Sequence, residues 1–382
     1  MKLSKEKLDG HVYKKKYWGG LMGFSFDMNT SSAIYKLLGV KIGSSSLTGG
    51  ITKVQLFGFI KFRSKKLTRR MLEPLLILYL RKLGVDTTKR QILAWYNRSG
   101  EFFLLNFHLK DYLRQHDIHN PVLITPQDFE KEVLELFGNH CETQTIPYVF
   151  HHLHFAGVEK IEQPNLHYLG LMPHEHFVQV EKKLQNGSDL HFYTALKETV
   201  QVSDALAATP EIPRQVAQTA EEKMRLLGLH KPFVYIAPSA QSNGTLSKSF
   251  WSQLPLSLAQ LGYDFFFNNM PHGLNNSYCK TCYLSLPEAR YVASQAAAII
   301  GIRSGLMDVI ANKTSEIICI YKHFGHRSKE FPHLEASRVM SGFSLKPLPH
   351  VEPSHLHEID GDSESEENIL RNISTILSNI KH

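Results

Sequence analysis

The stretch that decides the fold is LSLPEARYVASQAAAIIGIRSGLMDVIANKTSEIICIY, from Leu284 to Tyr321. Pro287 and Glu288 open its first part, where a fixed φ and an acid in the first turn favour a helix. Ile299-Ile300 is short and β-branched, as in a strand buried in a parallel sheet. The pattern predicts helix, strand, tight turn, helix and strand, an order typical of an α/β domain with a parallel sheet.

The turn after Ile300 is the first candidate binding site. Gly301, Arg303, Ser304 and Gly305 stand between a strand's carboxyl end and a helix N-terminus. Such an edge attracts anions, because free N–H groups and the helix dipole meet there. A charged guanidinium and a hydroxyl suit a diphosphate. An equally good alternative is that Arg303 forms a structural ion pair at the strand end.

A second strand-loop-helix unit favours the binding interpretation. Residues 231–237 predict a buried strand, 249–261 a helix closed by Gly262, and 263–267 another strand. The polar loop between them carries Ser239, Ser242, Thr245 and Lys248. Parallel strands point the same way, so this loop and the Arg303 turn share one edge. A plain polar surface loop is the alternative, but two such loops predict a phosphate-binding crevice.

These motifs resemble the donor-binding domain of GT-B glycosyltransferases, in particular the heptosyltransferase group and bacterial surface-polysaccharide transferases. The resemblance covers about Phe233 to Tyr321. It implies a nucleotide-sugar donor bound by Ser239, Ser242, Lys248, Arg303, Ser304, Gly305 and Asp308. In that group the turn usually reads Asp-Ser/Thr-Gly with a His shortly after, whereas here Arg303 stands at the Asp position and Asp308 at the His position. We expect Arg303→Ala to weaken donor binding and leave the fold intact.

The first half of the chain predicts a second unit of the same kind. Residues 90–96 indicate a strand, 102–116 a helix and 121–125 the next strand. The resemblance implies that Glu101, in the turn, is the general base for the acceptor hydroxyl, with inversion at the anomeric carbon. Glu101 could instead simply stabilise the helix N-terminus. Arg98, His151 and His152 are weaker candidates for acceptor binding, the histidines following a strand predicted at 146–150.

Composition and length set the domain organisation. The chain has 382 residues, 42% hydrophobic and 21% charged, which fits a soluble protein of two ordinary domains. We predict an α/β, GT-B fold of two Rossmann-like domains facing a central cleft. The predicted parts are a basic N-terminal extension over 1–85, an acceptor domain over 86–215, a nucleotide-sugar domain over 216–345, and an acidic linker with a C-terminal helix over 346–382. That helix suits a return to the first domain or a dimer contact.

Cysteine use and terminal composition predict a cytoplasmic protein. Neither a transmembrane stretch nor a signal peptide is indicated, and the chain has 4 cysteines. Cys279 and Cys282 have metal-like spacing, but ordinary thiols are the favoured interpretation over zinc. No metal and no cofactor are predicted.

Basic residues concentrate early in the chain, and the formal net charge is +7. Interleaved with aromatics, they suit an anionic membrane surface and hence peripheral attachment to the inner face of the cytoplasmic membrane. Nucleic acid is a less favoured partner, and a solvated basic face is an alternative to both.

The predicted function is transfer of a sugar from a nucleotide-sugar donor to a glycan or lipid-linked acceptor in capsule or lipopolysaccharide biosynthesis. Two other classes stay open. One is a dinucleotide or sugar-nucleotide enzyme, although no GxGxxG follows either strand. The other is a noncatalytic surface-binding or nucleic-acid-binding protein.

Overall fold

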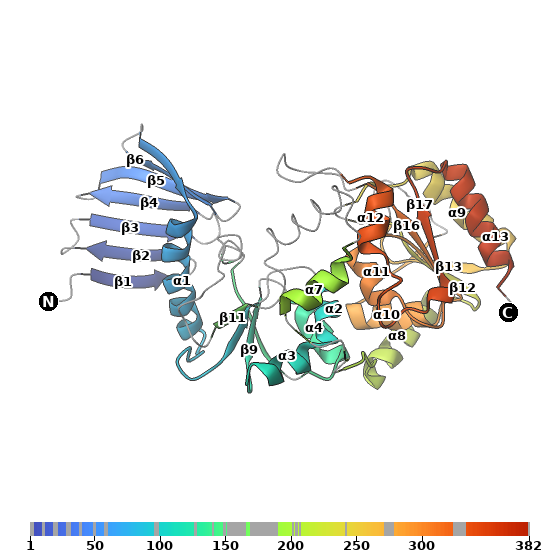
Figure 1. The fold of residues 1–382 in the computed structure, drawn as a ribbon, viewed down its shortest axis with the longest axis horizontal. Helices are drawn as coiled ribbons and strands as arrows, with labels where there is room; N and C mark the ends of the chain where they lie inside the picture. The colour runs from blue at the N-terminus through green and yellow to red at the C-terminus, as the bar shows by residue number, and fades with distance from the viewer. Residues whose placement is uncertain are drawn as a thin grey trace. The chain divides into compact units, whose positions relative to one another are not determined.

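The computed structural model (Figure 1) forms two compact units. One unit contains residues 1–96, 117–128 and 141–176, and the other 97–116, 129–140 and 177–382. The structure describes residues 4–9, 12–17, 22–27, 32–37, 40–48, 51–56, 60–94, 99–125, 128–139, 141–147, 150, 166–168, 190–200, 202, 205, 208–240, 243–270, 279–323 and 334–380. Within these residues, no helix has the length and apolarity that a bilayer crossing needs.

The N-terminal residues form a seven-stranded sheet in which each strand pairs antiparallel with the next along the chain. Its strands are β1 (Ser4–Asp9), β2 (Val12–Tyr17), β3 (Met22–Asp27), β4 (Ser32–Leu37), β5 (Val40–Thr48), β6 (Ile51–Leu56) and β7 (Ile60–Ser64). Helix α1 (Lys65–Lys82) follows directly and runs beside the strands in Figure 1. Leu72, Leu75, Leu76 and Leu80 of this helix are buried, a spacing that places them on one face.

A four-stranded parallel sheet follows, in the order β10-β9-β8-β11. Its strands are β8 (Ile92–Ala94), β9 (Val122–Thr125), β10 (Glu142–Thr145) and β11 (Leu166–Tyr168). The first two agree with the predicted strands. The strand predicted at 146–150 is wrong, because the ladder ends at Ile146, whose N–H donates to the Thr125 carbonyl at 2.8 Å, and Pro147 has no N–H to continue it.

The single helix predicted at 102–116 is two helices, α2 (Ser99–Asn106) and α3 (Leu109–Gln115). Tertiary contacts at the break override the helical pattern. The Phe107 carbonyl accepts a hydrogen bond from the Ala208 N–H at 3.3 Å, and the His108 ring lies 2.7 Å from the Tyr193 hydroxyl. Helix α4 (Phe129–Leu136) comes after β9, and α7 (Phe192–Val200) carries Tyr193.

The larger unit is built on a six-stranded parallel sheet, in the order β14-β13-β12-β15-β16-β17. Its strands are β12 (Phe233–Ala237), β13 (Asp264–Phe267), β14 (Lys280–Thr281), β15 (Ala298–Ile302), β16 (Glu316–Tyr321) and β17 (Leu356–Asp360). Its helices are α8 (Arg214–Leu226), α9 (Lys248–Gln260), α10 (Leu286–Ser294), α11 (Gly305–Ile310), α12 (Ala336–Phe343) and α13 (Glu366–Ser378). The mixed α/β class with parallel sheets is therefore confirmed.

Local signals fix the helix ends, and three of them, Pro287, Glu288 and Gly262, were predicted from the sequence. Ser285 caps α10 in a capping box with Glu288, and Pro287 lies in its first turn. Ser247 caps α9, and Gly262 just beyond it has φ +82°, the left-handed conformation that glycine adopts at helix ends.

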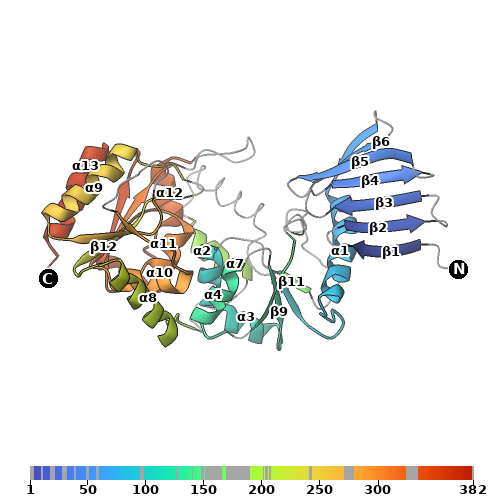
Figure 2. The ribbon, with the colours of Figure 1, turned by 180° about the vertical axis from the view of Figure 1, so that it is seen from behind.

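The terminal helix α13 covers the larger sheet together with α9, beside which it lies in both views (Figures 1 and 2). Ile369, Ile373 and Leu377 are buried in the core formed with Trp251 and Leu254 of α9. The expectation that this helix returns to the first domain is therefore wrong, and a dimer contact stays a prediction. The apolar stripe of α13 is buried within the unit to which the helix belongs. The Tyr263 hydroxyl also donates to the Leu377 carbonyl of this helix at 3.0 Å.

Candidate functional site

The candidate site lies at the carboxyl edge of the six-stranded sheet, between the neighbouring parallel strands β12 and β15. The connections that follow these two strands run to opposite sides of the sheet. The chain passes from β12 through α9 to β13 on one side, and from β15 through α11 to β16 on the other. Such a switch point opens a crevice outside the strand ends, where α/β proteins bind ligands. The two predicted loops are the ones that flank it.

Arg303 is buried in the turn after β15, with 7% of its surface exposed. Its guanidinium binds the Asp308 carboxylate through both terminal nitrogens, at 2.7 and 3.2 Å. It also donates to the carbonyls of Phe343 at 2.7 Å and Ser304 at 2.6 Å. These bonds take up nearly all of its N–H groups. Arg303 thus forms the structural ion pair that was one of the two alternatives, and a role in donor binding stays a prediction.

The ion pair gives the unusual sequence of this turn a physical meaning. Arg303 and Asp308 are the two positions at which the chain departs from the Asp and His of the resembled group, and they contact each other. Burial raises the pKa of Asp308, and the charge and hydrogen bonds of Arg303 offset this only in part. The two departures form a matched pair of opposite charges in a buried position.

Helix α11 is held at both ends. Ser304 caps its start, accepting from the Met307 N–H at 3.4 Å. At its end, Nη1 of Arg290 donates to the carbonyls of Val309 and Ala311, at 2.5 and 3.1 Å, where a cation also suits the helix dipole. Burial lowers the pKa of Arg290 to about 10, so the group is still charged at neutral pH. The Ser304–Gly305 turn is rigidly placed as a result.

Gly100 brings the turn with Glu101 against the Ser304–Gly305 turn. A Cβ atom added to Gly100 would lie 2.5 Å from the Gly305 Cα and 2.7 Å from the Asp308 carboxylate. Only glycine allows this approach of α2 to α11. Glu101, the next residue, is half-buried in the first turn of α2. The structure therefore brings together the predicted base and one of the two predicted donor loops.

His350 is a buried member of this region that the sequence pattern did not indicate. Its Nε2–H donates to the Asp308 carbonyl at 2.7 Å, and its ring stacks on Phe107 with ring centroids 5.2 Å apart. Burial lowers its pKa to about 3, so the ring is neutral at physiological pH. Through the Asp308 carbonyl it supports the Arg303–Asp308 turn.

Further contacts tie the loop after β12 to the ends of β15 and β16. The buried Asn243 amide donates to the Arg303 carbonyl at 2.6 Å, and the Gly244 N–H donates to the His323 carbonyl at 2.9 Å. A Cβ at Gly244 would lie 2.9 Å from the His323 ring. The sequence did not indicate a role for Asn243 and Gly244, because an Asn-Gly pair in a polar loop is typical of an ordinary turn.

The end of β16 meets the turn after β17 through an ion pair. Nζ of Lys322 lies 2.5 Å from Oδ1 of Asp362. The other carboxylate oxygen, Oδ2, accepts from the backbone N–H of His323 at 2.8 Å. Burial alone would raise the pKa of Asp362, but these hydrogen bonds outweigh it and the pKa is lowered. The acidic run predicted as a linker thus contains a structural carboxylate, Asp362, at the sheet edge.

The remaining predicted donor residues lie on the other flank of the switch point. Ser239 and Lys248 are exposed, and Lys248 is the first residue of α9. The N-cap Ser247 of that helix donates its N–H to the Glu366 carboxylate at 2.6 Å. Ser242, Arg98, His151 and His152 lie outside the described residues.

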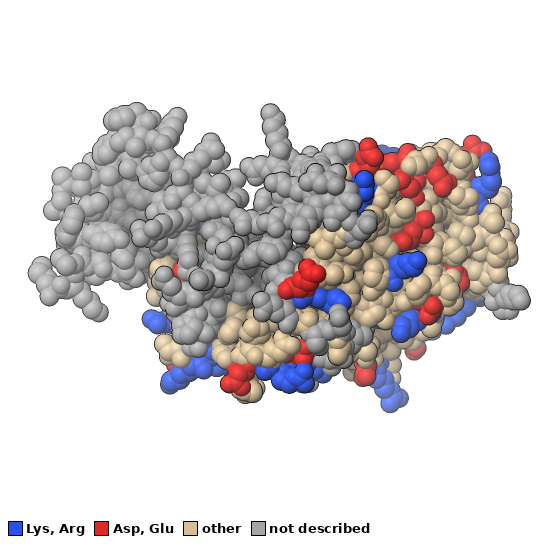
Figure 3. All heavy atoms as spheres, in the orientation of Figure 1, with Lys and Arg blue, Asp and Glu red and all other residues tan. Residues whose placement is uncertain are grey.

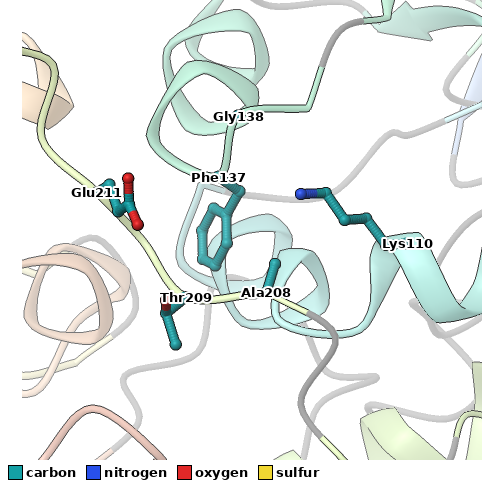
Figure 4. Close-up of a pocket in the computed structure, with 6 residues that line it drawn as sticks. All are labelled: Lys110, Phe137, Gly138, Ala208, Thr209 and Glu211. Carbon is teal, nitrogen blue, oxygen red and sulfur yellow. The ribbon is translucent and has the colours of Figure 1, made fainter.

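A separate hollow of about 310 Å³ lies beside α3 and the end of α4 (Figure 4). Its lining residues are Lys110, Phe137, Gly138, Ala208, Thr209 and Glu211. In Figure 4 the Lys110 ammonium and the Glu211 carboxylate flank Phe137 from opposite sides. None of the predicted site residues lines it, so we do not include it in the candidate site.

Cys279 and Cys282, which flank β14, are free thiols. Burial raises the pKa of both, which keeps them protonated and poorly nucleophilic at neutral pH. In the described part of the chain, no group of three or more His, Cys, Asp and Glu residues is arranged to hold a metal ion.

No protein-family model and no curated protein matches the chain. Among solved structures, it is similar to a family 9 glycosyl transferase from Veillonella parvula DSM 2008, with 14% identity, 77% of this chain and 98% of the other covered, and a TM-score of 0.49. It is also similar to the E. coli ADP-heptose lps heptosyltransferase II, with 13% identity, 75% and 98% covered, and a TM-score of 0.46. For the E. coli heptosyltransferase WaaC with ADP, the identity is 9%, the coverage 75% and 100%, and the TM-score 0.43.

Proposed function

We propose that the protein is a GT-B glycosyltransferase that moves a sugar from a nucleotide-sugar donor to a glycan or lipid-linked acceptor in the biosynthesis of a bacterial surface polysaccharide. The observation that carries the proposal is the contact of Gly100 with Gly305. It joins the turn bearing an acid to a turn at the switch point of a parallel sheet. An acid beside a diphosphate-binding edge is what activation of an acceptor hydroxyl requires.

The charges of the site divide between support and binding. The N–H groups of Arg303 already donate to the Asp308 carboxylate and to backbone carbonyls, so we assign Arg303 mainly to shaping the turn. We assign binding to Lys248, exposed at the start of α9, and to the hydroxyls of Ser239, Ser242 and Ser304, the last of which also caps α11. They would counter the charge that grows on the diphosphate as it leaves. Gly305 would allow close approach of the donor, and Asp308 would hold Arg303.

The acceptor side and the cellular setting complete the proposal. Arg98, His151 and His152 would contact the acceptor, with an acceptor domain over 86–215 and a donor domain over 216–345. The protein would act in the cytoplasm on a capsule or lipopolysaccharide precursor. ADP-heptose, named for one of the similar solved structures, is the first donor to test.

Thermal stability in the presence of nucleotides tests the class of the protein. A donor present at 100 times its Kd raises the unfolding free energy by about 2.7 kcal/mol, which appears as several degrees in Tm. We expect such a shift with one of the ADP, UDP, GDP or CMP sugars. A shift with NAD alone would identify a dinucleotide enzyme instead, and no shift with any of these compounds would favour a noncatalytic binding protein.

Glu101→Gln tests the general base. If Glu101 removes the acceptor proton, the variant loses about 10²- to 10⁴-fold in kcat and keeps its donor-induced Tm shift. If Glu101 only stabilises the helix, the loss is about 0.3–1 kcal/mol of stability with turnover near wild type. Glu135→Gln, an exposed acid on the neighbouring α4, is the matched control and should leave kcat unchanged.

A further inference from the structure

The pairing register of the N-terminal sheet determines on which of its two faces each Lys and Arg residue lies. Residues directly opposite in neighbouring strands, and residues two apart along a strand, share a face of a sheet. When the register shift of the β4–β5 pair between Tyr35 and Lys36 is taken into account, every Lys and Arg of β1 to β7 except Lys15 falls on one face, which we call the basic face. The residues concerned are Lys5, Lys7, Lys14, Lys16, Lys36, Lys41, Lys53, Lys61 and Arg63. In the sequence these residues are spread over about 60 positions and form no single motif.

The aromatic residues occupy the opposite face. Every Tyr and Phe of the seven strands falls there, namely Tyr13, Tyr17, Phe24, Phe26, Tyr35 and Phe62. Of the basic-face residues whose side chains are described, Ile34 is 38% exposed, and Val12, Ser25 and Asp27 are half-buried. None of the four has the full burial of a core position, as expected for a sheet face that is open to solvent.

The basic face contains like charges directly opposite one another. The register pairs Lys5 with Lys16 and Lys7 with Lys14 between β1 and β2. It also pairs Lys36 with Lys41 between β4 and β5, and Lys53 with Arg63 between β6 and β7. Like charges at such positions destabilise a sheet. An array of this kind is relieved when an anionic partner lies over it, because the partner neutralises the repulsion.

We propose that this face binds the surface of an anionic lipid bilayer. The basic residues lie on six of the seven strands, and β1, β2 and β7 each carry two of them. They therefore spread both across and along the sheet, which matches a plane of head groups better than one polymer strand. All but Arg63 are lysines, point charges that need no defined partner geometry. By contrast, the described part of the larger unit mixes both signs on the face in Figure 3.

Nucleic acid fits this face less well than a bilayer. Proteins that bind single strands stack bases on aromatic side chains, and here the strand aromatics lie on the other face. The DNA major groove admits a helix or a two-stranded ribbon, but not a seven-stranded sheet. The inference rests on the register of the sheet alone and does not depend on the chemistry proposed for the site.

Vesicle co-sedimentation of the full chain tests this inference. The probes are vesicles of phosphatidylcholine with 30% phosphatidylglycerol, and vesicles of phosphatidylcholine alone. We expect binding to the anionic vesicles at 50 mM salt, loss of binding at 500 mM salt, and none to the neutral vesicles. Since each lysine near an anionic surface contributes about fivefold, Lys36→Gln/Lys41→Gln should weaken binding about 25-fold.

The control variant is Lys89→Gln/Lys346→Gln, which removes the same charge from two exposed lysines outside the sheet. It should bind anionic vesicles like the wild type. Removing the opposed pair Lys36/Lys41 should leave the Tm of the free protein unchanged or raise it, so weaker binding would not reflect misfolding. The proposal is overturned if the wild type does not bind anionic vesicles at low salt, if both variants lose binding equally, or if the chain binds single-stranded DNA and no vesicles.

Discussion

Arg303→Ala lowers the free energy of unfolding by about 3–5 kcal/mol, since it leaves the buried Asp308 carboxylate without its counter-charge. The pair is buried on both sides, with side-chain exposures of 8% and 6%. The substitution also removes the hydrogen bond from Nε of Arg303 to the Phe343 carbonyl. This expectation replaces the one from sequence alone, in which the variant weakened donor binding and kept its fold. Urea denaturation of wild type and variant measures the difference.

A second variant separates the lost charge balance from lost packing. Arg303→Met with Asp308→Leu removes both charges and keeps most of the volume, and should recover most of the lost stability. If this double variant also keeps the donor-induced Tm shift, Arg303 only shapes the turn. If the shift disappears in the stable double variant, Arg303 takes part in donor binding. A loss below about 1 kcal/mol for Arg303→Ala would contradict the buried ion pair.

Gly100→Ala destabilises the larger unit by about 2–3 kcal/mol or more, because the added methyl group needs space that backbone atoms occupy. The Gly305 Cα and carbonyl oxygen would lie 2.5 and 2.7 Å from the new atom, and backbone moves less readily than a side-chain end. Helix α2 must shift away from α11. We therefore expect turnover to fall further than stability, since Glu101 moves with α2.

Gly305→Ala is the graded control on the other side of this contact. Its added methyl group would meet the Gly100 nitrogen at 3.3 Å, a tight distance that a small adjustment relieves. It should cost less than about 1 kcal/mol of unfolding free energy, and only stability is compared because Gly305 also belongs to the proposed donor turn. Equal losses of stability for the two variants, measured by urea denaturation, would show that the close approach of α2 and α11 is not the cause.

The parallel sheet of the larger unit was predictable because its signals are local. Ile299-Ile300, the first-turn residues Pro287 and Glu288, and Gly262 each act within a few positions of the chain. Strand β17 was not predicted, because its half-buried residues alternate weakly and follow a Pro-rich and His-rich segment. Helix α13 was predicted as a helix, but its partner α9 could not be, since an apolar stripe does not specify what covers it.

In the candidate site, sequence indicated the positions and structure gave their roles. Arg303, Ser304 and Gly305 were found from the turn pattern. The pairing of Arg303 with Asp308 and the stacking of His350 on Phe107 depend on which segments meet in space. For the same reason the sequence does not show the basic face of the N-terminal sheet. Lys36 and Lys53 share this face only through the pairing of the strands between them.

The chain passes several times between the two units, so neither unit can be prepared as one continuous fragment. The chain passes from one unit to the other after residues 96, 116, 128, 140 and 176. Strand β8 and helix α2 are consecutive in sequence yet belong to different units. No single cut therefore releases either unit as a continuous polypeptide, and a protease that nicks one of these junctions should yield a complex that separates only on denaturation.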